Sequence, residues 1–203
     1  MQYLKDEVRD KIKEEALKEF KKVGYKGASI RRIAANSNTS VGNLYKYFES
    51  KEALYENIIG SVYDKLMGYL NKFEEVELNE NACDIFYGLA EKIKEIFKAS
   101  SVEIAVLFNK SQGSKYENCK NYFVEFVTKI VTDISIYELS KKGKTLKDNF
   151  IIYVLAHSLV ESISIIVNEK EDGEEVRNLI NSIIDIYFKD LENKLVNNPA
   201  TLD

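Results

Sequence analysis

Residues 37–54, SNTSVGNLYKYFESKEAL, bring together side chains that can form hydrogen bonds with a nucleic acid. Asn43 can donate to and accept from the edge of a base, and Lys46 can reach a guanine acceptor or a phosphate. The hydroxyls of Tyr45 and Tyr47 can bond phosphate oxygens. The two tyrosines could instead pack in an ordinary core, so their function depends on which way each side chain points.

A helix over residues 40–47 would divide these side chains between two faces. Counting about 100° per residue from Leu44 places Phe48 on the same, inner side. The outer side carries Gly42, Asn43 and Lys46, and the two tyrosines edge it. Gly42 has no side chain to hold the backbone away from a partner. An outer face of this composition is unusual for a core helix and suits the groove of a duplex.

The elements that must position this segment are marked by caps and turn residues. Ser29, Ser40 and Ser50 each precede a predicted helix and can cap it. Gly24 fits the position just past the end of a first amphipathic helix, and Asn38 suits a left-handed turn. Two short helices joined by a polar turn are typical of a helix-turn-helix, with residues 40–47 as the recognition helix.

Charge is distributed unevenly along the chain. The net charge is −4 over all 203 residues, but residues 20–51 contain seven basic side chains and one acidic one, whereas residues 61–203 have a net charge of −7. A basic segment on an acidic chain indicates a polyanionic partner for that segment. Of the adjacent Arg31 and Arg32, only one can easily point at a DNA backbone.

Residues 12–59 resemble the DNA-binding domain of the TetR family of transcriptional regulators. The resemblance rests on Phe20, Gly24 and Tyr25, on the run SIRRIA, on Ser40 and on the run GNLYKYFESKEAL with its spacing. It implies an all-helical, dimeric, ligand-responsive repressor or activator that binds a palindromic operator. Carried over residue by residue, the family's DNA contacts fall on Ser29, Arg31, Thr39, Gly42, Asn43, Tyr45, Lys46, Tyr47 and Lys51.

The sequence departs from the family's pattern around the turn. Ser37, Asn38 and Thr39 stand where the family often has Ala-Gly-Val, and Val41 is often polar in relatives. Asn38 can replace glycine in a left-handed turn. Lys51 lies in the first turn of the next helix, where a cation opposes the helix dipole. We therefore expect a phosphate opposite Lys51.

The rest of the chain predicts further helices and an all-α fold. Helical runs cover residues 81–99, 101–110, 114–140, 147–168 and 173–195. We expect two domains, a helix-turn-helix DNA-binding domain over residues 1–55 and a helical effector-binding and dimerisation domain over residues 56–203.

Residues 150–167 are apolar almost all round, which predicts a helix buried on both faces. The segment is short for a membrane span and contains His157 and Glu161, so we expect no membrane. It could pack on its own domain on one side and on a second subunit on the other. The predicted homodimer interface comprises Ile151, Leu155, Leu159, Ile180, Ile183, Ile184, Tyr187 and Leu191.

A small hydrophobic effector is expected in the C-terminal domain. His157 is the one histidine of the chain. It could be a hydrogen-bonded core residue or a polar anchor in an effector pocket. The candidate pocket residues are Phe86, Phe108, Tyr122, Phe126, His157 and Glu161.

Other classes of function find little support. Cys83 and Cys119 have no spacing typical of a zinc site or a disulfide framework, and we expect no metal and no cofactor. A nucleophile motif and a glycine-rich phosphate loop are missing, so an enzyme is not expected. The N-terminus runs directly into charged sequence, which favours a cytoplasmic protein. The alternative to a DNA-binding regulator is a helical module whose exposed aromatic face binds protein.

Overall fold

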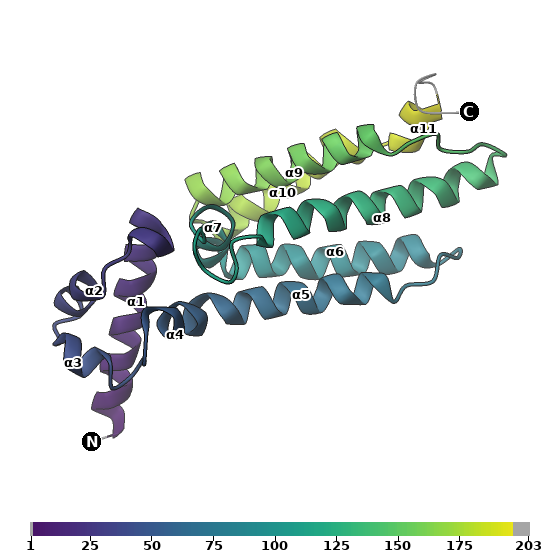
Figure 1. Ribbon diagram of the computed structural model, residues 1–203. Coiled ribbons are helices and arrows are strands. Elements are labelled where there is room, and N and C mark those ends of the chain that lie inside the picture. Colours follow the sequence, from purple (N-terminus) through teal and green to yellow (C-terminus); the bar gives the residue numbers. More distant parts are fainter. Residues whose placement is uncertain (1, 197–203) are drawn as a thin grey trace. The chain divides into compact units, whose positions relative to one another are not determined.

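The computed structural model describes residues 2–196, and helices dominate this part of the chain. The predicted all-α fold class is confirmed. The helices are α1 (Gln2–Gly27), α2 (Ile30–Asn36), α3 (Val41–Leu44), α4 (Lys51–Tyr55), the π-helical turn η1 (Glu56–Gly60), α5 (Ser61–Glu74), α6 (Ala82–Ala99), α7 (Ser101–Asn109), α8 (Cys119–Lys141), α9 (Phe150–Glu169), α10 (Gly173–Phe188) and α11 (Leu191–Val196) (Figure 1).

The chain forms two compact units. The first unit contains Met1–Lys65 and Val102–Cys119, and the second unit contains Leu66–Ser101 and Lys120–Asp203. The first unit extends past the predicted boundary at residue 55, as far as Lys65 within α5, and it also includes Val102–Cys119, which contains most of α7.

In the first unit, α1 packs against α2 and α4, and α2 packs against α3 (Figure 1). The predicted apolar stripe of α1 is confirmed, since Ile12, Ala16 and Phe20 are fully buried. Leu44 from α3 and Leu54 from α4 are also fully buried. These side chains form the core that holds the helix-turn-helix in place.

The predicted serine caps and the predicted left-handed turn at Asn38 are confirmed. Ser29, Ser40 and Ser50 each accept a hydrogen bond on the side-chain oxygen from the backbone N–H three residues later, at 3.4, 3.1 and 3.0 Å. Asn38 has a positive φ of 52°. These local bonds fix where α2, α3 and α4 begin.

Gly24 marks a kink in α1 rather than its end. Its φ is 74° and its ψ is 168°, after which the chain makes one more helical turn to Gly27. The N–H of Tyr25 donates to the carbonyl of Lys110 at 2.8 Å. A Cβ on residue 24 would lie 3.3 Å from the same carbonyl oxygen. Glycine therefore permits both the positive φ and the close approach of this segment.

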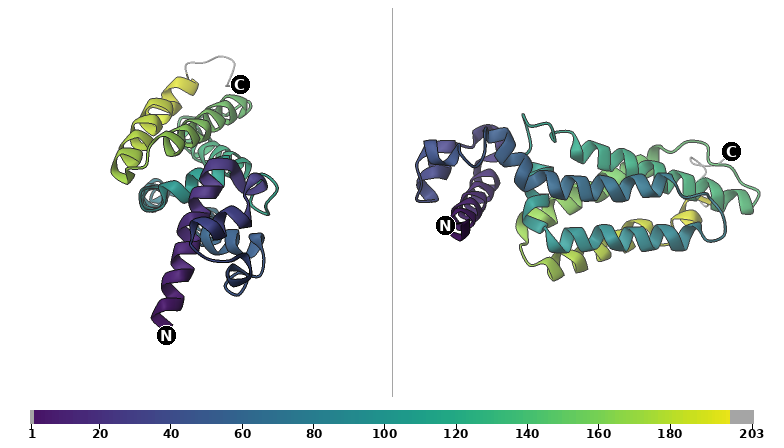
Figure 2. Two further views of the ribbon diagram at one scale, coloured as in Figure 1. Left: turned by 90° about the vertical axis from the view of Figure 1, so that its left-hand side faces the viewer. Right: turned by 90° about the horizontal axis from the view of Figure 1, so that it is seen from below.

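In the second unit, α6, α8, α9 and α10 lie side by side (Figures 1 and 2). Helix α10 packs against both α6 and α9. Helix α9 is long and apolar enough, with a mean hydropathy of 2.0, to meet the composition of a membrane span. However, Ala156, Val160 and Val167 on its inner face are buried in the core of this unit.

The predicted helix over residues 173–195 is wrong in one respect, because it is two helices. Helix α10 ends at Phe188, and Asp190 has a positive φ of 56°. Aspartate tolerates this left-handed conformation better than most residues. The break turns Leu191 and Leu195 onto Ile152, with which they form a small apolar cluster.

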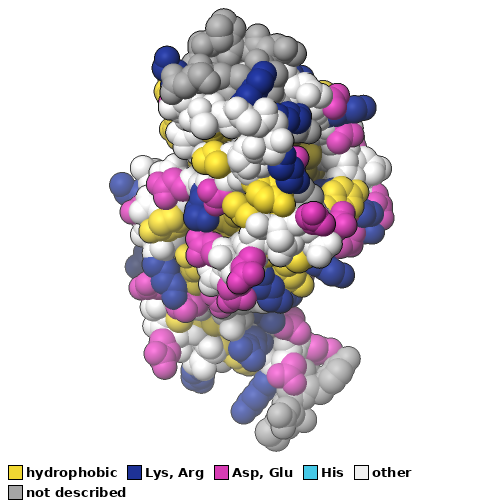
Figure 3. All heavy atoms as spheres, turned by 90° about the vertical axis from the view of Figure 1, so that its right-hand side faces the viewer, with side chains coloured by type: hydrophobic (Ala, Val, Ile, Leu, Met, Phe, Trp, Pro, Cys, Tyr) yellow, Lys and Arg dark blue, Asp and Glu magenta, His cyan; other side chains and the backbone are white. Residues whose placement is uncertain are grey.

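The surface carries charges of both signs. On the face drawn in Figure 3, Lys and Arg side chains alternate with Asp and Glu, and hydrophobic atoms lie between them. Such a mixture is typical of a solvated protein surface.

Candidate functional site

The predicted recognition helix is shorter as an α-helix than expected. Helix α3 covers Val41–Leu44, and residues 45–47 form a turn. In this turn the N–H of Lys46 donates to the carbonyl of Asn43 at 3.1 Å, and that of Tyr47 donates to Leu44 at 2.9 Å. These bonds link residues three apart, so the last turn is tightened as in a 3₁₀-helix.

The two predicted faces of this segment are present. Leu44 and Phe48 are buried, as expected for the inner side. Gly42 and Lys46 are exposed, and 45% of the surface of Tyr45 is accessible. A Cβ built on Gly42 would meet nothing within 4 Å. The outer face therefore leaves room for a partner to approach the backbone of α3.

Thr39 and Asn43 are joined across the start of α3. The side-chain amide of Asn43 donates to Oγ1 of Thr39 at 2.8 Å. This bond orients the amide and leaves the Thr39 hydroxyl hydrogen available for a further acceptor. Both side chains are half-buried, as is Tyr47. The pair is thus held in place before any partner arrives.

The two adjacent arginines of α2 have different surroundings. Nε of Arg32 donates to Oε1 of Glu19 at 2.8 Å, and Nη2 donates to the Gly27 carbonyl at 3.1 Å. Glu19 is only 6% exposed and also accepts the N–H of Ser29 at 3.1 Å. Arg31 is exposed. Arg32 therefore joins α1 to α2, and Arg31 is the one that can reach a DNA backbone.

Lys51 lies on the end of α1. Its Nζ donates to the carbonyl of Tyr25 at 2.8 Å, and the carbonyls of Lys26 and Ala28 are each 3.5 Å away. The ammonium is also 4.6 Å from the centre of the Tyr25 ring. A cation is favourable where helix carbonyls are exposed. Hence these carbonyls explain a lysine in the first turn of α4, where the sequence suggested a phosphate.

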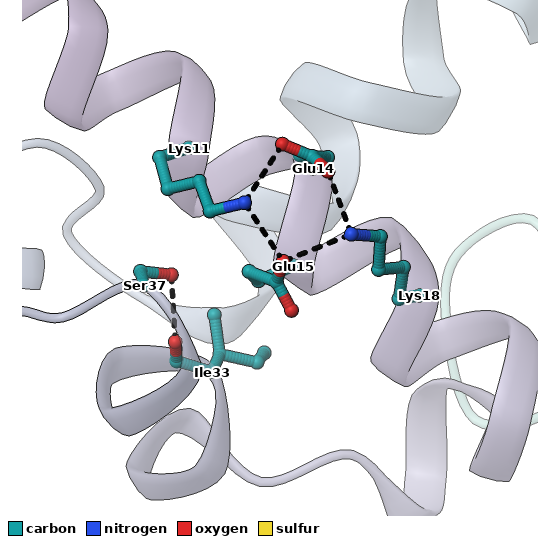
Figure 4. A network of polar contacts seen from close by, with 6 residues as sticks. All are labelled: Lys11, Glu14, Glu15, Lys18, Ile33 and Ser37. Atoms are coloured by element: carbon teal, nitrogen blue, oxygen red, sulfur yellow. Dashed lines mark hydrogen bonds and ion pairs between the residues drawn. The ribbon is translucent and has the colours of Figure 1, made fainter.

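A network of ion pairs covers one side of α1. Lys11 and Lys18 each pair with both Glu14 and Glu15, at distances of 2.6–3.1 Å (Figure 4). The four charges sum to zero. The positive charge of the first unit therefore comes from other segments, including α2 and the turn after α3.

Tyr55 links α4 to the segment that follows α7. Its hydroxyl lies 2.7 Å from Oγ of Ser111, which in turn donates to the Leu107 carbonyl at 2.7 Å. The ring packs on Phe20 and Tyr25, with centroids 4.7 and 4.8 Å apart. Burial raises the pKa of Tyr55 to about 12. Residues 55 and 111 are 56 positions apart, and nothing in the sequence indicates this pairing.

The second unit contains an apolar cavity of about 340 Å³ among α6, α8, α9 and α10. Of the predicted pocket residues, Phe86 and Phe126 line it. Lys94, which was not among the predicted pocket residues, also lines it. Lys94 belongs to the charged run EKIKEIFK, whose lysines are expected to be solvated, so the sequence did not indicate that it is buried.

The other predicted pocket residues lie elsewhere. Phe108 belongs to the first unit. Tyr122 and His157 are exposed, and Glu161 forms an ion pair with Lys120 at 2.8 Å. His157 was predicted to be either a core histidine or a polar anchor in an effector pocket, and both predictions are wrong. The residue lies on the outer face of α9, away from the core and the cavity. An apolar helix gives little indication of which side is inward.

An exposed apolar stripe runs along α9 and α10. It consists of Phe150, Tyr153, Val154 and Ile165 from α9 and Ile186 from α10, each more than a third exposed. Along α9, residues 150, 154, 157, 161 and 165 share one face at 100° per residue. His157 and Glu161 therefore lie within the stripe, between Val154 and Ile165.

Several predicted interface residues point inward instead. Leu159 and Ile180 are buried and line the cavity together with Ile184, and Leu191 belongs to the cluster around Ile152. Leu159 lies opposite Phe150 on α9, at about 180°. Ile151, Leu155, Ile183 and Tyr187 are half-buried and border the outer surface.

Residues 12–58 match the sequence profile of the family described as bacterial regulatory proteins, tetR family. The chain is 32% identical over 76 residues to YttP of Bacillus subtilis (strain 168), named a probable HTH-type transcriptional regulator, covering 37% of this chain and 35% of YttP. It is 32% identical over 74 residues to IcaR of Staphylococcus aureus, a biofilm operon icaADBC HTH-type negative transcriptional regulator, covering 36% of this chain and 37% of IcaR. The matches thus span little more than a third of the length of these curated relatives.

Solved structures are similar over a larger part of the chain. NalD of Pseudomonas aeruginosa, the secondary repressor of the MexAB-OprM multidrug efflux pump, matches with a TM-score of 0.53 at 12% identity, over 92% of this chain and 98% of NalD. A Clostridium perfringens protein described as a fatty acid metabolism regulator matches with a TM-score of 0.55 at 21% identity, over 87% of this chain and 96% of that one. At these identities the likeness concerns the fold.

Proposed function

Because residues 12–58 place this chain in the TetR family, we propose that it is a DNA-binding transcriptional regulator that binds a palindromic operator as a homodimer. We further propose that it is a cytoplasmic, ligand-responsive repressor and not an enzyme. A helical protein-interaction module is the alternative that the experiment below must exclude.

The outer face of α3 carries this proposal. Gly42 on α3 and Tyr45 and Lys46 in the turn after it are exposed, whereas Leu44 is buried. None of the three is needed to hold the segment, because Leu44, Phe48 and the Ser40 cap do so. An exposed glycine, lysine and tyrosine on a well-anchored helix suit the major groove better than they suit a core.

Each proposed DNA contact has a role that follows from its surroundings. Asn43 and Lys46 read base edges, and the backbone at Gly42 approaches the groove. Arg31, Tyr45, Tyr47, Thr39 and Ser29 bond phosphates. Lys51 holds the end of α1 against the start of α4, so it positions the interface rather than binding a phosphate of its own.

The exposed stripe on α9 and α10 supports a symmetric dimer. Several exposed apolar side chains on one face of a helix mark an interaction surface. Two copies of this face, one from each protomer, would bury Phe150, Val154, Ile165 and Ile186 in a four-helix interface. Contact with a second protomer would also explain why α9 is so apolar, with no need for a membrane.

The cavity of the second unit supports the ligand-responsive part of the proposal. A ligand that binds one dimer geometry more tightly than the other would shift the spacing of the two recognition segments. The small hydrophobic effector expected from the sequence suits the apolar lining.

Selection of bound duplexes from a random pool, followed by sequencing, tests the proposal. We expect inverted repeats whose half-sites are about one helical turn or a multiple of it apart. A Tyr45→Ala, Lys46→Ala double variant, purified as a folded dimer, should enrich no sequence. If the wild-type protein enriches nothing either, the chain is not a sequence-specific DNA-binding protein.

A further inference from the structure

We propose that the cavity of the second unit binds a long-chain carboxylate. The unbranched hydrocarbon chain would lie along the apolar lining of this cavity, and the carboxylate would bind the ammonium group of Lys94. This inference rests on the proposed function for its regulatory meaning, because it names the class of effector. The binding site itself is argued from the cavity alone.

The lining excludes ligands with many polar groups. Apart from Lys94 and the hydroxyl of Tyr87, every lining side chain is a hydrocarbon. A polar ligand group buried against such a wall would lose its hydrogen bonds to water without replacement, which is strongly unfavourable. Sugars, nucleotides and peptides are therefore poor candidates. The cavity suits a ligand with a hydrocarbon body and a single polar end.

The distribution of the lining residues favours a long chain over a compact ring. Along α6 they run from Phe86 to Phe97, and along α8 they run from Phe123 to Ile134. At 1.5 Å per residue each stretch is about 16 Å long. A volume of about 340 Å³ spread along two such stretches describes an elongated space. An extended alkyl chain fills such a space more completely than a compact molecule.

Lys94 is the one charged side chain in the described lining of the cavity. It is 8% exposed, and its Nζ donates to Oδ1 of Asn181 at 2.7 Å and pairs with Glu91. An ammonium group has three N–H bonds, so one remains without a partner among the described residues. Glu91 also pairs with Arg177 at 3.1 Å, so its carboxylate does not serve Lys94 alone.

A ligand carboxylate would complete this arrangement. A charge-assisted hydrogen bond from a buried ammonium is among the strongest that a protein offers a ligand. Tyr87, exposed and 5.6 Å from Nζ by its ring centroid, lies beside the same ammonium. The head group would therefore bind near Tyr87 while the chain extends along α8.

Two quantities follow for binding. Each methylene moved from water into the cavity should raise the affinity roughly fourfold until the cavity is full. Losing the bond to Lys94 should lower the affinity at least roughly tenfold. An alcohol of the same chain length lacks the charge and should bind more weakly than the carboxylate.

The experiment measures displacement of a fluorescent fatty acid by dodecanoate, decanoate and dodecanol, each below its micelle concentration. Lys94→Met removes the ammonium and keeps an apolar side chain, and Lys92→Met makes the same change at an exposed position of α6. Ala90→Phe fills the cavity from its wall, and Ala99→Phe adds the same ring at an exposed position of the same helix.

We expect wild-type protein to bind one dodecanoate per chain, roughly tenfold or more tightly than decanoate. Lys94→Met should weaken dodecanoate at least roughly tenfold and leave dodecanol unchanged. Ala90→Phe should abolish binding of both. Lys92→Met and Ala99→Phe should behave as wild type. If Lys94→Met does not fold, two other comparisons test the inference. The first is dodecanoate binding by Ala90→Phe against Ala99→Phe, and the second is the affinity of wild-type protein for dodecanoate against dodecanol.

The inference is overturned if wild-type protein does not bind dodecanoate, if Ala90→Phe binds it as wild type does, if a folded Lys94→Met variant does so, or if dodecanol binds as tightly as dodecanoate. The same preparations enter the selection from random duplexes. Selected DNA without dodecanoate binding would overturn this inference alone. Dodecanoate binding by a protein that selects no DNA would overturn the proposed function and leave the ligand class of the cavity in place.

Discussion

Replacing Gly42 by alanine should make the protein more stable and a weaker DNA binder. Gly42 is exposed within α3, and a Cβ there would meet nothing within 4 Å. Alanine loses less backbone entropy than glycine when a helix forms, so the free energy of unfolding should rise by about 0.5–1 kcal/mol. In a chain of this size the melting temperature would rise by about 1–4 °C.

The same methyl group should interfere with DNA. If the backbone of α3 approaches the groove closely, as glycine permits, the added methyl enters space that the duplex occupies. Overpacking of a close contact costs about 1–3 kcal/mol, so the affinity for a selected duplex should fall about fivefold or more. Thermal unfolding and fluorescence anisotropy of the same sample give the two quantities. A higher melting temperature together with a lower DNA affinity cannot result from misfolding.

Gly68→Ala is the matched control. Gly68 is an exposed helical glycine of the second unit, and a Cβ there would also meet nothing within 4 Å. Its replacement should give a similar rise in stability with unchanged DNA affinity. If Gly42→Ala binds DNA as tightly as Gly68→Ala does, the outer face of α3 does not meet the duplex closely, and this part of the reasoning is wrong.

Three further outcomes are expected. Lys46→Ala should weaken DNA binding without changing the melting temperature. Lys51→Ala should lower the free energy of unfolding by about 1–2 kcal/mol, because the ammonium of Lys51 bonds the carbonyl at the end of α1. Equal melting curves for the two variants would contradict this expectation. Glu19→Gln should lower the free energy of unfolding, measured in urea, by about 1–3 kcal/mol, since its buried carboxylate holds α2; an unchanged midpoint would show that it does not. Burial raises the pKa of Tyr55 from 10.0 to about 12 and that of Cys119 from 9.0 to about 12. The contribution of each protonated group to the free energy of unfolding is therefore complete below about pH 9 and is lost as the pH rises toward 12. In urea titrations from about pH 8 to pH 11, Tyr55→Phe and Cys119→Ala should each lose less stability with rising pH than the wild type does.

The sequence was most informative where local chemistry decides the structure. The serine caps, the positive φ of Gly24 and Asn38 and the buried positions of Leu44 and Phe48 all follow from residue type and spacing within a few positions. In these cases the preference of the residue and the demand of the fold agree. The helix-turn-helix could therefore be predicted in some detail.

Features that depend on distant neighbours could not be predicted. Lys94 is buried because α10 supplies Asn181 opposite it, 87 positions later in the chain. Lys51 is placed by the carbonyls of α1, and the break at Asp190 lets Leu191 reach Ile152. Since helix α9 is apolar almost all round, periodicity did not show which side faces the core.

The salt dependence of DNA affinity tests the central claim most directly. With a selected duplex, the logarithm of the binding constant should fall linearly with the logarithm of salt concentration, by a slope of about −0.9 for each phosphate neutralised. Lys46→Ala should reduce the magnitude of this slope by about one per protomer if the lysine meets a phosphate, and should relax base preference with little change in slope if it meets a base. An affinity that does not change with salt, in wild type and variant alike, would contradict a DNA interface and favour a surface that binds protein.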